Sequence, residues 1–238
     1  LINHSVKIVQ LKFPKHRLAV LRRKILIVSY RGLGFWNARL QPKEVYCLKR
    51  GYHSAHHAEA FDDTLNKDEW QRSVYEKALA LAQQYNCRSI IDVGCGSAYK
   101  LVHLFENYST LGIELSDTYN WLTEKYPDKK WMSYEHANPA ELNGDLVICS
   151  DVIEHIKNPD EMMDFLQKMH FRFLILSTPE RDEVRGNNDF GPPENTAHYR
   201  EWNKREFRNY VSAWFKVQEH LVFDDKSVTQ VVVCNQRG

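Results

Sequence analysis

The feature that most constrains this chain is a short apolar run that ends in a glycine-rich turn. Residues 89–93 read S-I-I-D-V, the turn Gly94-Cys95-Gly96 follows directly, and apolar residues at helical spacing resume at Leu101. Glycine at such a turn adopts backbone angles that other residues avoid, and it lets a ligand approach the main chain. This segment therefore predicts a buried strand, a tight turn and the start of a helix, with a ligand site at the turn.

An acidic residue at the end of the next apolar run narrows the kind of ligand. Residues 110–115 form a second strand-like run, and Glu114 stands near its end, 18 residues after Gly96. A carboxylate at this strand end can accept hydrogen bonds from both hydroxyls of a ribose. The strand, the turn, the helix and the distant acid together predict a nucleoside-containing ligand, rather than a structural turn beside a solvated glutamate.

Strand-like and helical segments alternate through most of the chain from residue 66 onward. Strands that alternate with helices form a mainly parallel sheet, and near-continuous apolar runs indicate strands covered on both faces. Ser116 is a plausible N-cap for the helix after the second strand. The expected strands are residues 89–93, 110–115, 131–135, 145–150 and 171–177, and the expected helices include residues 70–84 and 159–169.

The last part of the chain has a different pattern. Residues 215–223 and 227–233 are both strand-like, and only three residues separate them. A crossover helix between parallel strands does not fit in that space, so the two segments should pair with each other in the antiparallel sense. We therefore expect a hairpin at one edge of the sheet.

Length and charge suggest one domain with an extension. The chain has 238 residues, which we divide into an N-terminal extension, residues 1–65, and a domain, residues 66–238. The first 50 residues hold 12 of the 32 lysines and arginines but one of the 31 acids, Glu44, which leaves 20 bases and 30 acids for the remainder. A basic arm of this kind is typical of nucleic-acid or anionic-surface contacts. We favour a solvated or partner-binding extension, since the net charge of the whole chain is only +1.

Cysteine usage points to a reducing compartment. The five cysteines include no C-x-x-C pair, and Cys95 and Cys149 lie inside apolar runs. This pattern predicts reduced, buried cysteines, a cytoplasmic protein and no zinc site. The adjacent His56 and His57 have no cysteine nearby, so no metal site is expected there either. The most apolar early stretch, residues 25–30, is too short to span a bilayer.

The composition of the turn favours one nucleoside cofactor over another. A dinucleotide site requires G-x-G-x-x-G, with its pyrophosphate at the helix N-terminus. This turn reads G-C-G-S-A-Y, and Tyr99 crowds the place of a pyrophosphate. Asp92, just before the turn, is an unfavourable neighbour for phosphate but suits a cationic amino group. S-adenosylmethionine is therefore a better match than NAD.

From about residue 70 to residue 238 the chain resembles the class I S-adenosylmethionine-dependent methyltransferases. The resemblance rests on D-V-G-C-G at residues 92–96 and on D-V-I-E-H at residues 151–155. The second motif is similar to that of a broad group of small-molecule methyltransferases. The family fold implies an α/β, Rossmann-like sheet of seven mostly parallel strands in the order 3-2-1-4-5-7-6, with strand 7 antiparallel and helices on both faces.

The resemblance also implies a cofactor site. Asp92 would hold the amino group of S-adenosylmethionine, and Glu114 would bind its ribose. Ala98 stands where the family usually has a third glycine, and alanine is small enough to keep the close packing of helix on sheet. The residues implied to contact the cofactor, or its product S-adenosylhomocysteine, are Asp92, Gly94, Cys95, Gly96, Glu114, Leu115, Glu135, His136, Ser150 and Asp151.

Two pairs in this set have distinct roles in the family. Glu135 and His136 fall where the family contacts the adenine, often through an aspartate. Ser150 and Asp151 would face the sulfonium and the acceptor. These assignments place the reacting atoms at the end of the fourth strand.

The resemblance implies methyl transfer from a sulfonium. In this reaction the protein mainly aligns the reacting groups and excludes water. A base is needed only if the acceptor is a hydroxyl or a protonated amine, and no metal need take part. His155 and His198 are the candidate bases, with closure of the pocket beside the cofactor as the alternative role of His155.

A long polar insert that starts at Ser177 is the expected acceptor cover. It leaves the C-terminal edge of the sheet, where ligands bind in open α/β folds, and an insert of this length is usually functional. We expect His198, Tyr199 and Arg200 to point inward toward the acceptor, with a self-packed surface loop as the alternative. The N-terminal extension is a candidate lid, in which Tyr52 contacts the acceptor.

These patterns predict a methyltransferase that acts on oxygen or nitrogen of a small molecule such as a metabolite, a sugar or a secondary-metabolite intermediate. An RNA methyltransferase that uses the basic arm is the second interpretation. A non-catalytic protein that keeps the cofactor fold is a third, disfavoured by the intact Asp92, Gly94, Gly96 and Glu114. An NAD-linked dehydrogenase is the most distant. The patterns leave the acceptor, the methylated atom and the oligomeric state open.

Overall fold

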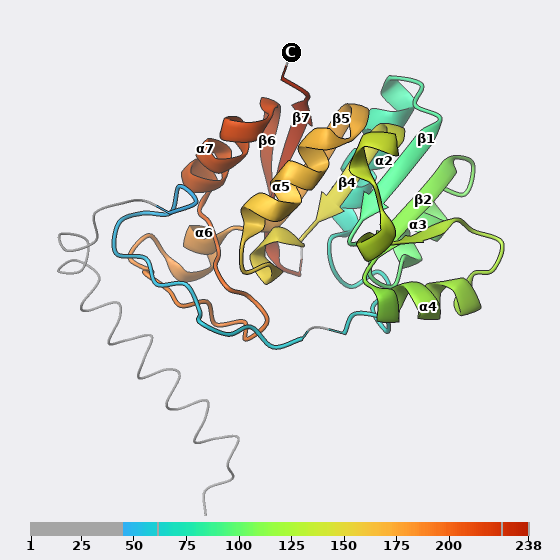
Figure 1. The fold of residues 1–238 in the computed structure, drawn as a ribbon. Coiled ribbons are helices and arrows are strands. Elements are labelled where there is room, and N and C mark those ends of the chain that lie inside the picture. The colour runs from blue at the N-terminus through green and yellow to red at the C-terminus, as the bar shows by residue number, and fades with distance from the viewer. Residues whose placement is uncertain (1–44, 61, 225, 238) are drawn as a thin grey trace, which may run out of the picture.

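A computed structural model describes residues 45–60, 62–224 and 226–237. They form one sheet in the strand order β3-β2-β1-β4-β5-β7-β6, in which β7 runs antiparallel to both of its neighbours (Figure 1). The predicted order and the antiparallel seventh strand are confirmed. The strands are β1 (Ser89–Val93), β2 (Ser109–Glu114), β3 (Trp131–Ser133), β4 (Asn143–Ser150), β5 (His170–Pro179), β6 (Lys216–Asp224) and β7 (Val228–Asn235).

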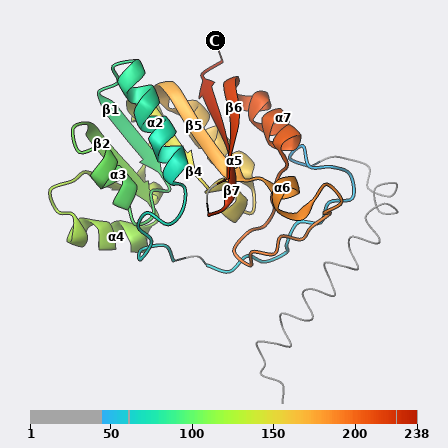
Figure 2. The ribbon, with the colours of Figure 1, turned by 180° about the vertical axis from the view of Figure 1, so that it is seen from behind.

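Helices cover both faces of this sheet, as predicted. Successive side chains of a strand point to opposite faces. In β4, Leu146 and Ile148 join one apolar cluster, whereas Val147 and Cys149 join the other. The first cluster includes residues of α2 (Arg72–Gln84), α3 (Tyr99–Leu104) and α4 (Ser116–Lys125), which Figure 2 shows in front of the sheet; the second includes residues of α5 (Pro159–Lys168) and α7 (Lys204–Trp214). No helix in the described part of the chain is long and apolar enough to cross a membrane.

Two local expectations need correction. Ser116 is the first residue of α4, and Leu115 occupies the N-cap without a capping side-chain bond. The third strand ends at Ser133, so Glu135 lies in the 3₁₀ helix η1 (Tyr134–His136) instead of in the strand. Only η1 and η2 (Pro139–Glu141) separate β3 from β4, because this connection is too short for a crossover α-helix.

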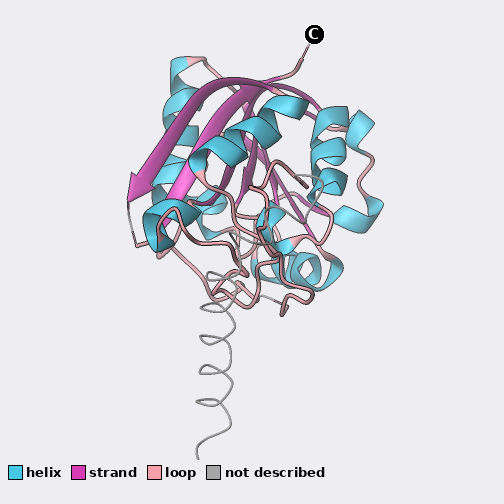
Figure 3. Ribbon diagram, turned by 90° about the vertical axis from the view of Figure 1, so that its left-hand side faces the viewer, coloured by secondary structure: helices cyan, strands magenta, loops and turns pink. Residues whose placement is uncertain are grey.

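The irregular connections gather at one end of the sheet, away from the C-terminus (Figure 3). They include the insert between β5 and α7, residues 180–203, which contains the short helix α6 (Arg181–Arg185). Residues 45–60 run beside this insert (Figures 1 and 2). Backbone amides bind insert carbonyls from His53 to Phe190 at 2.8 Å, from Ala55 to Tyr199 at 2.7 Å and from Glu59 to Thr196 at 2.9 Å. The basic residues 1–44 lie outside the described residues.

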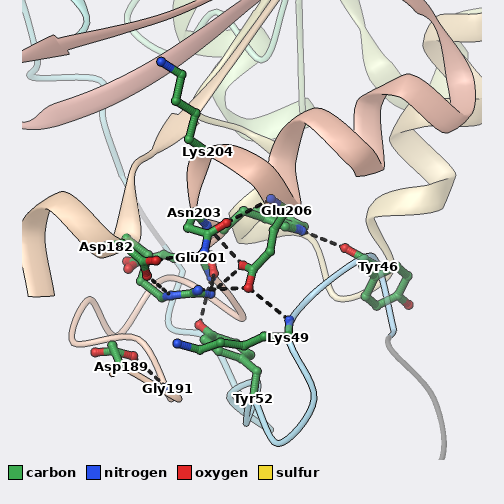
Figure 4. A network of polar contacts seen from close by, with 12 residues as sticks. Tyr46, Lys49, Tyr52, Asp182, Asp189, Gly191, Glu201, Asn203, Lys204 and Glu206 are labelled. Carbon is green, nitrogen blue, oxygen red and sulfur yellow. Dashed lines mark hydrogen bonds and ion pairs between the residues drawn. The ribbon is translucent and has the colours of Figure 1, made fainter. Parts of the chain in front are cut away.

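A buried ion pair fastens the insert to α7 (Figure 4). The guanidinium of Arg181 has no solvent exposure and donates to both carboxylate oxygens of Glu206, at 2.7 and 3.0 Å. Glu206 also accepts a hydrogen bond from the backbone of Lys49 at 3.0 Å. Close by, the hydroxyl of Tyr52 accepts from the backbone of Glu201 at 3.0 Å. The N-terminal segment, the insert and α7 therefore meet at one buried charge pair.

We predict that Glu206→Gln lowers the free energy of unfolding by about 3 kcal/mol, because it removes the buried counter-ion of Arg181 and leaves only the more exposed carboxylate of Asp182, 3.1 Å away. Glutamine keeps the shape of the side chain, so packing changes little. Urea denaturation of the purified chain measures the effect. Asp164→Asn is the matched control, since Asp164 pairs with Lys168 on an exposed face, and its loss should cost less than about 1 kcal/mol. Equal small costs in the two variants would contradict the anchoring role.

Candidate functional site

Asp92 occupies the carboxyl end of β1 and is fully buried. Its Oδ2 accepts a hydrogen bond from the hydroxyl of Tyr75 at 2.8 Å. Its Oδ1 has no hydrogen-bond partner among the described residues. Burial raises the pKa of Asp92 to about 7. A buried acceptor without a donor is costly, so this atom favours a ligand that brings an N–H group.

The turn after β1 leaves its backbone open to a close approach. Gly94 and Gly96 both have positive φ, at 74° and 52°. A Cβ on Gly96 would lie 1.7 Å from Oδ2 of Asp63, so a larger residue would displace the Asp63 side chain in addition to the strain of the positive φ. The amide of Gly96 donates to Glu114 at 3.0 Å, and the amide of Leu115 donates to the other carboxylate oxygen at 2.7 Å. Glu114 thus lies against the turn, as the sequence predicts, and its remaining lone pairs can accept from two hydroxyls.

Sequence reasoning missed two charged residues beside this turn. Asp63 was assigned to the extension, yet its carboxyl lies against Gly96, and burial raises its pKa. Lys100 is buried, donates to the carbonyl of Lys67 at 3.1 Å, and has its pKa lowered by burial. A lysine in the first turn of the helix after the glycines is a signal that could have been used. Nothing in the sequence near Asp63 marks it.

The residues expected to contact adenine lie at the ends of β2 and β3. Glu135 accepts from the hydroxyl of Ser133 at 2.5 Å and from the backbone of Ser116 at 3.3 Å. The hydrogen bond from Ser133 is the main reason that the pKa of Glu135 falls to about 2. His136 is exposed, and the side chain of Leu115 is 59% exposed beside them. An exposed apolar side chain next to polar acceptors suits the face and edge of a purine.

The carboxyl ends of β4 and β5 form a hydroxyl–carboxylate network. The hydroxyl of Ser177 donates to Asp151 at 2.6 Å, and the hydroxyls of Ser150 and Ser177 lie 2.9 Å apart. Asp151 has a positive φ of 53°. Burial raises the pKa of Asp151. This strained, half-buried acid is the residue for which the sequence predicts contacts with the sulfonium and the acceptor.

Two histidines far apart in the sequence meet next to this network. The ring centroids of His155 and His198 lie 4.6 Å apart in an edge-to-face arrangement. Nδ1 of His155 is 3.0 Å from the carbonyl of Ala197, and Nδ1 of His198 is 2.6 Å from a carboxylate oxygen of Glu201. Burial lowers the pKa of His155 to about 4, so that ring is neutral at pH 7. The structure brings the two candidate bases together and adds Glu201, which sequence reasoning missed.

Tyr199, Arg200 and Tyr52 make contacts that hold the insert in place. Arg200 donates to the carbonyls of Ile156 and Lys157 at 2.7 and 2.6 Å. The backbone amide of Tyr199 donates to the carbonyl of Glu154 at 2.8 Å. Tyr52 is buried against Glu201, and burial raises its pKa. These contacts are structural ones, and the expected contacts of the three side chains with an acceptor stay predictions.

A comparison with models of protein families shows which family the chain belongs to. A model of the methyltransferase domain matches residues 59–227, well over half of the chain. The chain belongs to this methyltransferase family. No curated protein matches its sequence significantly.

Similar solved structures are also methyltransferases. The magnesium protoporphyrin IX methyltransferase of Synechocystis PCC 6803, with bound SAH, is 16% identical, with a TM-score of 0.54 over 90% of this chain and 99% of that one. An Aquifex aeolicus SAM-dependent methyltransferase is 15% identical, with a TM-score of 0.53 over 75% and 100%. The methyltransferase domain of bacterial CtHen1 is 18% identical, with a TM-score of 0.53 over 69% and 98%. At these identities the likeness shows the shared class I fold.

We predict that Asp92→Asn stabilises the ligand-free methyltransferase at pH 8 relative to the natural chain, and that the difference disappears toward pH 4. The pKa of Asp92 is raised, from 3.8 to about 7, so the folded state favours the neutral acid. Stability therefore falls as the pH rises through this window, and asparagine removes that loss. Thermal unfolding from pH 4 to pH 8 measures it, with Asp128→Asn at an exposed position as control. A difference that does not change with pH would refute the assignment.

Proposed function

We propose that the chain is an S-adenosylmethionine-dependent methyltransferase that methylates oxygen or nitrogen of a small molecule, such as a metabolite, a sugar or a secondary-metabolite intermediate. The observation that carries the proposal is the unpartnered Oδ1 of buried Asp92, beside a glycine turn whose backbone accepts a close neighbour. Glu114 lies against the same turn. Asp92 can accept from an amino group and Glu114 from the hydroxyls of a ribose, and the glycine turn lies between them. These acceptors match the hydrogen-bond donors of S-adenosylmethionine.

The chain's own residues would hold the two ends of the cofactor. Asp92 would bind the amino group, and Lys100, the buried cation next to it, would bind the carboxylate. Glu114 would accept from the ribose hydroxyls, while Leu115 and Glu135 would meet the face and edge of the adenine. When bound, the cofactor supplies a methyl group that is already activated on a sulfonium.

The protein's contribution to the reaction is alignment and exclusion of water. Asp151 and Ser150, at the end of β4, would face the acceptor. The insert covers this region, because the backbone of Tyr199 binds Glu154 and the guanidinium of Arg200 binds the two residues that follow His155. A small acceptor would therefore lie between the end of β4 and the insert, next to His155 and His198.

We predict that S-adenosylhomocysteine binds the purified chain and that NAD does not, as measured by calorimetric titration. Glu114→Gln should weaken binding of S-adenosylhomocysteine by a factor of about 10–100, because hydrogen bonds to a charged group are worth about 1.5–3 kcal/mol. Glu124→Gln, on the exposed side of α4, is the matched control and should bind normally. No binding to the natural chain would overturn the proposed function.

Methylation of RNA is the second candidate, and the basic composition of the first 50 residues favours it. A small-molecule enzyme should bind a labelled single-stranded RNA only non-specifically, with a dissociation constant of about 10⁻⁴–10⁻⁶ M near physiological salt. Fluorescence anisotropy at two salt concentrations measures this. Tighter binding, which falls steeply with salt and is lost when residues 1–44 are removed, would favour RNA as the acceptor.

A further inference from the structure

Glu154 is a buried carboxylate that the proposed function does not use. It lies in η3 (Ile153–His155), directly after β4, and has no solvent exposure. Neither of its carboxylate oxygens has a hydrogen-bond partner within the described ranges. Burying a carboxylate without a partner is far more costly than burying a neutral group. The position therefore requires a proton or a cation beside it.

The two neighbouring histidines present the lone pairs that a metal ion needs. Nδ1 of His155 faces the carbonyl oxygen of Ala197, and Nδ1 of His198 faces the carboxylate of Glu201. Both oxygens are acceptors, so each Nδ1 carries the proton and donates it. In the neutral form of either ring, the lone pair is then on Nε2. Metal-binding histidines typically have this arrangement, with the second nitrogen bonded to a carbonyl or a carboxylate.

The three side chains are close enough to share one ion. A ligand atom from each of Glu154, His155 and His198 lies within 4.8 Å of the other two. Metal–ligand bonds of about 2.0–2.2 Å in a tetrahedral site place any two ligand atoms about 3.3–3.6 Å apart, so side-chain shifts of about 1–1.5 Å close the site. The amide of Asn195 lies 3.0 Å from Nε2 of His198 and would have to turn away.

We propose that Glu154, His155 and His198 bind one divalent transition-metal ion, for which Zn²⁺ and Mn²⁺ are the best matches. Two imidazoles and one carboxylate suit these ions, and three protein ligands leave a position open for a further oxygen. This replaces the expectation that the chain has no metal site. Cysteine spacing and the adjacent His56 and His57 were the metal patterns visible in the sequence, whereas Glu154 and His198 are 44 positions apart.

The position of the site suggests what the open coordination position would hold. Glu154 lies three residues after Asp151, just beyond the carboxyl end of β4. Its backbone carbonyl accepts a hydrogen bond from Tyr199 of the insert. An acceptor oxygen bound there would be held next to the reacting end of the cofactor. This role rests on the proposed methyl transfer, whereas metal binding itself does not. A histidine whose Nε2 binds the ion is not available as a base, so the proposal gives His155 and His198 a different task.

The test is a titration of the chelator-treated full chain with Mn²⁺, followed by electron paramagnetic resonance of the unbound ion, and a parallel calorimetric titration with Zn²⁺. We expect one ion per chain. Glu154→Gln keeps the shape of the side chain and should weaken binding by a factor of about 100 or more, since even loss of a supporting group costs about 10–100-fold. His155→Asn tests a second ligand independently. The double variant His56→Asn/His57→Asn is the matched control, since it removes two exposed histidines outside the cluster.

The outcomes separate this proposal from that of methyl transfer. One tight ion in the natural chain and in the control, lost in Glu154→Gln and in His155→Asn, supports the site. No saturable binding of either ion to the natural chain overturns it, and so does equal binding in both ligand variants. Circular dichroism checks that each variant is folded, and if Glu154→Gln is not, His155→Asn decides. Binding of S-adenosylhomocysteine is measured separately, so the cofactor site can succeed or fail independently.

Discussion

The central strands β1 and β4 are apolar on both faces, and the two helical layers close over them. Their register pairs Ile90 with Leu146, Ile91 with Val147 and Asp92 with Ile148. Because these side chains alternate between two buried clusters, a shift of one residue would turn every side chain of a strand to the opposite face and disrupt the packing of both clusters. The positions of the strand ends follow from this pairing. Asp92 is thereby held at the edge of the sheet, and Ser150, two residues beyond the pair of Asp92 and Ile148, lies at the same edge.

Several carboxyl groups lie at this edge of the sheet in surroundings that disfavour their ionised form. Asp92, Asp151 and Glu154 are carboxyl groups whose pKa values are raised by burial. In each case the folded state favours the neutral acid, so keeping the ionised form at neutral pH costs stability. Hydrogen bonds from the hydroxyl of Tyr75 to Asp92 and from that of Ser177 to Asp151 offset that cost only in part. The remaining unpartnered oxygens of Asp92 and Glu154 are where ligands would restore the lost hydrogen bonds or charge.

The insert after β5 brings residues that are distant in the sequence to the candidate site. It is anchored by the buried pair of Arg181 and Glu206, and residues 45–60 hydrogen-bond along it. The insert carries His198 to a ring-centroid distance of 4.6 Å from His155. We therefore expect a change that loosens this anchor to alter the position of His198 relative to His155 as well as to lower stability.

The sequence alone determined the sheet, its strand order through a family resemblance, and which residues we propose for the cofactor end of the candidate site. These features are local: β1, its glycine turn and the acid at the end of β2 fall within 26 residues, where hydrophobic periodicity and turn chemistry act directly. Only the tertiary structure decided that Asp63 lies against Gly96 and that Glu154, His155 and His198 form one cluster. Those contacts join segments 33 to 44 residues apart through irregular connections. No periodicity records such contacts, because they depend on how the insert and the N-terminal segment pack over the edge of the sheet.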